Sequence, residues 1–117
     1  MVKIENKLGS ISITSDVFTN IAGDAATKCF GVKGMAGRSK NDGLVQLLKR
    51  ESMSKGVHVK RGDNGSITIE LHIVVDHGVN LSALGTSIIE EVNYKVSSAT
   101  GVSVSKVDVF VDSMIVE

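Results

Sequence analysis

Apolar and polar residues alternate over several short stretches of the chain, and this period of two predicts β-strands with one buried face. We expect strands over 11–13, 32–35, 57–59, 67–73 and 107–111. Val102 and Val104 are out of phase with the last of these strands, which predicts a bulge or bend near Ser105.

Apolar residues that recur every three or four positions predict two main helices, over 16–29 and 81–99. Ser15 and Asn80 are the expected N-caps, because a side-chain oxygen there can accept a hydrogen bond from the first turn. Gly101 is expected to end the second helix.

The middle of the chain is expected to hold a glycine-rich loop over 34–41, followed by a short amphipathic helix over about 42–50. A turn within 62–65 then joins two strands into a hairpin. Residues that face each other across a ladder share a face, so matching the apolar residues requires a loop of about three or five residues. Asn64 or Gly65 should take positive φ there.

These elements predict an α+β fold, a two-layer sandwich of a mixed β-sheet with the two main helices on one face. The order strand, helix, glycine–valine, strand occurs twice, so we expect two βαβ-like halves. A chain of 117 residues suits one domain. We expect an N-terminal arm at 1–8, a single domain at 9–112 and a C-terminal tail at 113–117.

Composition narrows the class of protein. Aromatic residues make up 3% and Trp is absent, so deep aromatic pockets for sugars or bases are not expected. The single cysteine, Cys29, excludes an internal disulfide and favours a reducing compartment. The N-terminal residues lack a long apolar run, and no stretch reaches the ~20 apolar residues of a membrane span. We therefore expect a cytoplasmic protein without a signal peptide.

The net charge is zero, but the charges are unevenly distributed. Residues 33–61 carry eight basic and two acidic side chains, a net +6, whereas residues 62–117 carry two basic and eight acidic ones, a net −6. Such charges can simply keep the surface solvated. Alternatively, the basic segment of one molecule meets the acidic half of a neighbour, which would steer and orient association. This second interpretation nominates six partner-binding residues: Lys33, Arg38, Lys40, Lys49, Arg50 and Lys55.

Seven short segments, taken in their order and spacing, carry a resemblance to a known family. They are Gly-Ser-Ile-Ser-Ile at 9–13, Gly-Val-Lys-Gly-Met at 31–35, and the segments 54–59, 67–75, 78–81, 100–102 and 107–111. Together they span about residues 5–112. In this pattern the chain resembles the alkaline shock protein family of Gram-positive bacteria, also called the envelope stress response family.

The resemblance implies a non-enzymatic protein linked to stress of the cell envelope, without catalytic residues and without a cofactor. Some members self-associate, and a separate protein anchors them at the membrane. Short members are often encoded beside a kinase associated with fatty-acid phosphorylation. The resemblance thus implies a homo-oligomer with a cytoplasmic or membrane-anchored protein partner, possessing no membrane span of its own.

Candidate chemistry is sparse. By parity, His58, Glu70 and His72 share the polar face of the predicted hairpin, and imidazole and carboxylate groups bind zinc. An odd loop is expected to place the two histidines far apart along the ladder, so we expect a solvated face rather than a metal site. Cys29 lies on the apolar stripe of the first helix, where a free cysteine packs as a small hydrophobic residue.

The alternative function is a small RNA-binding module. Gly31-Val32-Lys33-Gly34 has the Gly-x-x-Gly form of the KH loop that clamps a nucleic-acid backbone, and the basic segment 33–61 could contact phosphates. A KH loop joins two helices directly, whereas the next helix is expected at about 42. Zero net charge and few aromatics make nucleic acid the less favoured partner. The amphipathic segment 42–50 also leaves peripheral membrane contact open.

Overall fold

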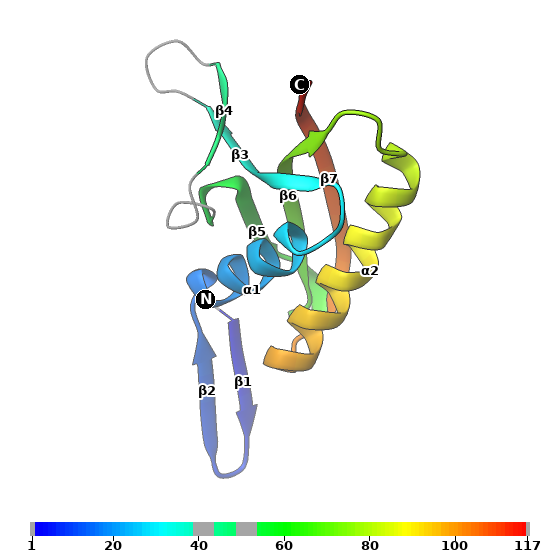
Figure 1. The fold of residues 1–117 in the computed structure, drawn as a ribbon. Coiled ribbons are helices and arrows are strands. Elements are labelled where there is room, and N and C mark those ends of the chain that lie inside the picture. The colour runs from blue at the N-terminus through cyan, green and yellow to red at the C-terminus, as the bar shows by residue number, and fades with distance from the viewer. Residues whose placement is uncertain (1, 39–43, 49–53, 117) are drawn as a thin grey trace.

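A computed structural model describes residues 2–38, 44–48 and 54–116 (Figure 1). The main sheet has five strands, and both α-helices lie on one face of it, which confirms the predicted α+β sandwich. The elements of this body are α1 (Ser15–Thr27), β3 (Val32–Arg38), β4 (Val45–Leu47), β5 (Val57–Arg61), β6 (Ile67–Asp76), α2 (Leu81–Thr100) and β7 (Val104–Ile115).

Strand β6 is the centre of the sheet. β7 runs parallel to one edge of β6, while β5 and β3 pair antiparallel with the first and second halves of the other edge. The inward residues of β6 are fully buried; they are Ile67, Ile69, Leu71, Ile73 and Val75. The same core includes the apolar stripe of α2, made of Leu84, Ile88, Val92 and Val96. The predicted unit of strand, long helix and parallel strand is therefore present as β6, α2 and β7.

The turn of the main hairpin and the bulge of the last strand are as predicted. Arg61 faces Ile67 across the ladder, so the loop between β5 and β6 has five residues, 62–66. Asn64 and Gly65 both have positive φ, at 59° and 77°. A register shift in β7 opposite Ile67 makes Ser105 the extra residue of a bulge.

The ends of the helices agree with the sequence at two of the three predicted positions. Asn80 Oδ1 accepts a hydrogen bond from Ala83 N at 3.1 Å, so Asn80 caps α2, and Gly101 ends α2 in the left-handed region with φ 75°. The prediction that Ser15 caps α1 is wrong by one residue. The N-cap is Thr14, whose side chain makes no capping hydrogen bond, and Ser15 is the first helical residue.

The segment between α1 and β5 differs from the prediction. Residues 36–38, expected only as a loop, belong to β3, and Val45–Leu47, expected in a helix, form the strand β4. Ala36 faces Leu47 in the antiparallel ladder that joins them. Residues 39–43 and 49–50 lie outside the described residues, so the prediction of a longer helix is corrected only for its middle.

Two glycines explain why β4 can lie on β3. A Cβ atom at Gly34 would lie 2.9 Å from Leu47 Cδ1, and a Cβ at Gly37 would lie 2.6 Å from Leu48 Cδ2. These glycines therefore leave room for leucine side chains of the neighbouring segment. In the sequence the same two glycines favoured a loop. Glycine occurs both in flexible loops and where another segment approaches the backbone closely, so the residue type alone does not distinguish the two.

The N-terminal segment forms a second sheet. β1 (Val2–Asn6), inside the segment expected as an arm, pairs antiparallel with β2 (Gly9–Ile13). This hairpin projects from the body, and the molecule measures 56 × 33 × 22 Å (Figure 1). β2 thus pairs with β1 instead of entering the main sheet, and β3 is antiparallel to β6, so the first predicted βαβ-like half is not formed.

The last strand is longer than the sequence indicated. β7 continues through the segment expected as a tail, where Met114 faces Val75 and Ile115 faces Asp76 of β6. A backbone hydrogen bond from His77 N to Ile115 O, 3.0 Å long, closes this end of the ladder.

Candidate functional site

The hairpin of β1 and β2 has one apolar face that the described part of the chain covers only at its base. Val2 faces Ile13 and Ile4 faces Ile11 across the ladder, so these four side chains share a face. Val2 is 7% exposed, and Ile4 and Ile13 are partly buried against the core. Ile11 is 57% exposed, and Leu8, in the turn, is 99% exposed. The apolar core therefore extends along the hairpin and ends in water.

The opposite face of the hairpin is polar and charged. It carries Lys3 and Glu5, whose Nζ and Oε1 atoms lie 3.2 Å apart and whose side chains are 55% and 66% exposed. Asn6 Oδ1 fixes the turn by accepting hydrogen bonds from Leu8 N at 2.8 Å and Gly9 N at 3.2 Å. Among the described residues β1 pairs only with β2, so its outer edge presents backbone N–H and C=O groups that a further strand could use.

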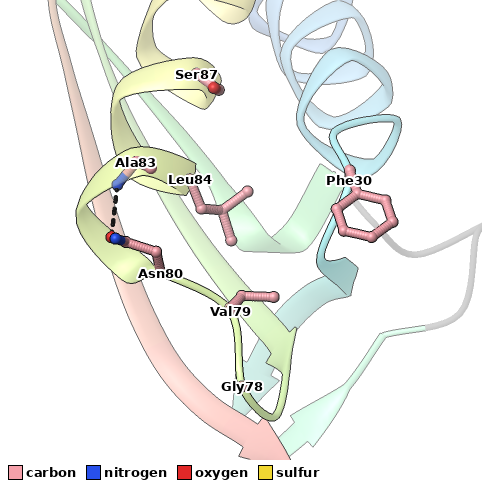
Figure 2. A pocket seen from close by; sticks show the side chains of 7 residues that line it. All are labelled: Phe30, Gly78, Val79, Asn80, Ala83, Leu84 and Ser87. Carbon is pink, nitrogen blue, oxygen red and sulfur yellow. Dashed lines mark hydrogen bonds between the residues drawn. The ribbon is translucent and has the colours of Figure 1, made fainter.

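A groove of about 440 Å³ separates the connection after α1 from the start of α2 (Figure 2). Phe30, 95% exposed, stands on one side, and Val79 and Leu84 lie on the other. Gly31, the next residue after Phe30, has φ 97°, and a Cβ there would come within 2.9 Å of Val79 Cγ1. The seven described lining residues include no acid or base, so the groove suits an apolar group rather than proton transfer.

Histidine and aromatic rings gather on the sheet face that points away from the helices. The rings of His58 and His72 have centroids 5.5 Å apart, and the ring of Phe110 stacks on His72 at 4.8 Å. The prediction that the two histidines lie far apart is wrong. His58 faces Glu70, which makes His72 its diagonal neighbour, and diagonal pairs are within reach of ring side chains.

His72 is held by the second bulge of β7. Its Nδ1 lies 2.8 Å from Asp112 Oδ2, a hydrogen bond in which the ring nitrogen donates. Asp112 is the residue inserted between two regular pairs of the β6–β7 ladder. By parity Asp112 shares the outer face with Phe110, but only the pairing of β7 with β6 places it beside His72.

A second cleft of about 300 Å³ is lined by His58, His72 and Asp112, together with Ala36, Gly37 and Lys55. Glu70, the third residue of the considered metal set, pairs instead with Lys60, whose Nζ lies 3.6 Å from its Oε1. Across the described residues, no three His, Cys, Asp or Glu side chains are placed so that they could hold a metal ion. The cleft can donate and accept hydrogen bonds at its rim.

The six predicted partner-binding residues are only partly described. Lys33 Nζ lies 3.4 Å from Asp76 Oδ1, and Lys55 is exposed at the cleft just defined. The pairs of Lys33 with Asp76 and Lys60 with Glu70 join the basic segment to the acidic half within one chain. Arg38 belongs to β3, but its side chain lies outside the described residues, as do Lys40, Lys49 and Arg50 entirely.

The Gly-x-x-Gly segment does not have the arrangement of a KH loop. β3 begins at Val32, and Gly34 is a buried residue within that strand. The segment therefore joins a helix to a strand, whereas a nucleic-acid clamp of the KH kind joins two helices.

Cys29 follows α1 and is half-buried, with its Sγ donating to Ala25 O at 3.5 Å. Burial, and secondly the negative charge of Glu91, raise the pKa of the Cys29 thiol above its ordinary value. The thiol therefore stays protonated at neutral pH, which is the unreactive form.

The sequence contains a signal for the β1–β2 hairpin, although residues 1–8 were expected as an N-terminal arm. Val2 and Ile4 alternate with Lys3 and Glu5, and the alternation matches that of 11–13 across a short polar turn. Two paired runs of period two are the pattern of a hairpin.

Curated proteins similar to this chain come from Gram-positive bacteria. An uncharacterized protein of Streptococcus pyogenes is 37% identical over 114 residues, which cover 97% of this chain and 93% of that protein. The uncharacterized protein YloU of Bacillus subtilis is 32% identical over 114 residues, covering 97% and 94%. YqhY of the same organism is 30% identical over 107 residues, covering 92% and 78%.

A solved structure of a MamM CTD variant is 16% identical, with a TM-score of 0.49, and covers 84% of this chain and 93% of that one. No helix in the described ranges has the length and apolar character needed to cross a membrane. A family model matches residues 3–116, the hairpin and the body together. The chain belongs to the alkaline shock protein 23 family, whose function is related to the cell envelope.

Proposed function

We propose that this chain is a non-enzymatic interaction module of the cell envelope response, which self-associates and binds a cytoplasmic or membrane-anchored protein. The observation that carries the proposal is the apolar face of the β1–β2 hairpin. It is continuous with the core at Val2 and ends in Ile11 and Leu8, which are left in water.

The energetics of a two-stranded sheet support a partner for this hairpin. An isolated hairpin is only marginally stable in water, and a third strand or a covering surface is needed for independent stability. Burying one isoleucine or leucine side chain contributes about 1.5 to 3 kcal/mol. Covering Ile11 and Leu8 in two copies of the chain would therefore supply a substantial driving force for association.

The basic segment 33–61 is the proposed surface for a different protein. Lys55 is exposed beside the cleft that His58 and His72 line, which leaves it available to a carboxylate of a partner. The partner that the resemblance suggests is an enzyme of the fatty-acid kinase type. The proposed location is the cytoplasm, at the membrane where a partner anchors the chain.

Sedimentation velocity of the purified protein over a range of concentrations tests the self-association. We expect the wild-type chain to sediment as an oligomer at micromolar concentration. The double variant with Leu8→Ser and Ile11→Ser should dissociate, because it loses the apolar contact. Tyr94→Ser is the control, since Tyr94 is a large side chain on α2 whose exposure, 64%, is close to that of Ile11. A wild-type chain that remains monomeric at high micromolar concentration would overturn the proposal.

A further inference from the structure

The outer edge of β1 carries a charge pattern that is complementary to itself. β1 reads Val-Lys-Ile-Glu-Asn over 2–6, with opposite charges one position to each side of Ile4. We infer that two copies of the chain join through their β1 strands, antiparallel about a two-fold axis at Ile4. This inference rests on the proposed self-association and specifies its geometry.

A two-fold axis through a strand pair limits the possible registers. Residues that face each other in an antiparallel ladder share a face, so each register brings one residue opposite its own copy. With Ile4 at the axis, Lys3 faces the partner's Glu5, and the pair occurs twice. With Lys3 or Glu5 at the axis, a like charge would lie directly opposite itself, which is destabilising. Among the three inner residues of β1, Ile4 is therefore the centre that the charges select.

The same register places the exposed apolar groups well. Ile4 faces the partner's Ile4, so the apolar faces of the two hairpins become one face of a four-stranded sheet in the order β2, β1, β1, β2. The antiparallel arrangement sets the tip of each hairpin beside the base of the other, where the partner's core begins. Leu8, at the tip and 99% exposed, thereby lies near an apolar surface instead of in water.

Pairing through β2 is less favoured by its sequence. β2 reads Gly-Ser-Ile-Ser-Ile and has no charges, so nothing in it selects one register over another. Within the described ranges β1 pairs with β2 alone, and its charge pattern selects a register.

The first test exchanges the charges in separate chains. K3E and E5K each place like charges opposite one another in both pairs of the dimer, so the dissociation constant of each variant alone should rise about tenfold. An equimolar mixture of K3E and E5K should recover the wild-type dissociation constant, because each chain then offers the charge that the other lacks. Both chains in the mixture still lack the internal Lys3–Glu5 pair, so recovery reports the contact between chains.

The second test is a disulfide at the axis, in a background with Cys29→Ser. Facing residues of an antiparallel pair have Cα atoms about 4.5 to 5.5 Å apart, within the range of a disulfide. I4C should cross-link to a covalent dimer on mild oxidation. I11C is the matched control, since β2 lies outside β1 and its two copies would be about 14 Å apart across three strand spacings.

The outcomes separate this inference from the proposed function. A wild-type monomer would overturn both. A wild-type oligomer whose charge variants are not rescued by mixing, or which cross-links through I11C and not I4C, would overturn the β1 pairing and leave self-association standing. Rescue in the mixture together with selective cross-linking of I4C is the expected result.

Discussion

β6 and β1 have the same alternation of apolar and polar residues, but the apolar face of β6 is buried and that of β1 is partly exposed. β6 has neighbours on both edges and α2 over its inward face, so its five inward residues are fully buried. β1 has one neighbour in the described structure, and its apolar face runs from buried Val2 to the exposed end of the hairpin. A period of two thus shows that a face is apolar, but the sequence does not show whether the same chain covers it.

The largest expected effect is a truncation at the centre of β6. Leu71→Ala should lower the free energy of unfolding by about 3 kcal/mol. Leu71 is fully buried, and the surrounding elements cannot close the cavity that the smaller side chain leaves. Urea unfolding followed by circular dichroism measures the loss. Thr68→Ala, on the other face of the same strand, should change stability by less than about 0.5 kcal/mol. Equal effects at both positions would mean that β6 is not the centre of the core.

A smaller effect is expected where the connection after α1 meets α2. Gly31→Ala should cost about 2 kcal/mol, because φ is 97° and the new Cβ would press on Val79. Gly85→Ala is the matched control within α2, where a Cβ meets nothing within 4 Å. It should stabilise the protein by about 0.5 to 1 kcal/mol, because glycine disfavours a helix interior. Thermal unfolding of both variants would show shifts of opposite sign.

Removal of the cap of α2 should cost less again. Asn80→Ala should lower the free energy of unfolding by about 1 kcal/mol, since Ala83 N loses its side-chain acceptor. Ser82→Ala, in the same first turn and exposed, is the comparison. A cost at position 80 no greater than at position 82 would show that the cap contributes nothing.

Local signals predicted much of the body. The odd hairpin loop followed from matching Val59 with Ile67 or Ile69, of which Ile69 is the observed partner, and the bulge at Ser105 followed from two valines out of phase. Both depend on residues close in sequence or directly paired. The N-cap Asn80 could be predicted for the same reason, because a capping side chain acts within one turn of its helix.

The positions that failed depend on distant neighbours. Gly34 and Gly37 favoured a loop, although their role is to admit leucines from β4. The contacts of His72 with His58 and with Asp112 follow from the pairing of β6 with β5 and β7, which local periodicity does not show. The ion pairs of Lys33 and Lys60 likewise join residues that are far apart in the sequence, Lys33 with Asp76 and Lys60 with Glu70.

The smallest expected effect is on the hairpin. It also tests the difference between β6 and β1 most directly. In dilute solution, Ile11→Ala should change the free energy of unfolding by less than about 0.5 kcal/mol, because the side chain is more than half exposed. At concentrations where copies associate, the cost should grow with protein concentration, because a ligand that binds only the folded state stabilises it by mass action. Leu71→Ala should cost the same at every concentration if the dimer is intact, because β6 is covered by its own chain.

Urea midpoints measured over a hundredfold range of concentration separate the two behaviours. A cost for Ile11→Ala that is large in dilute solution, or that does not change with concentration, would show that the hairpin is completed within one chain after all.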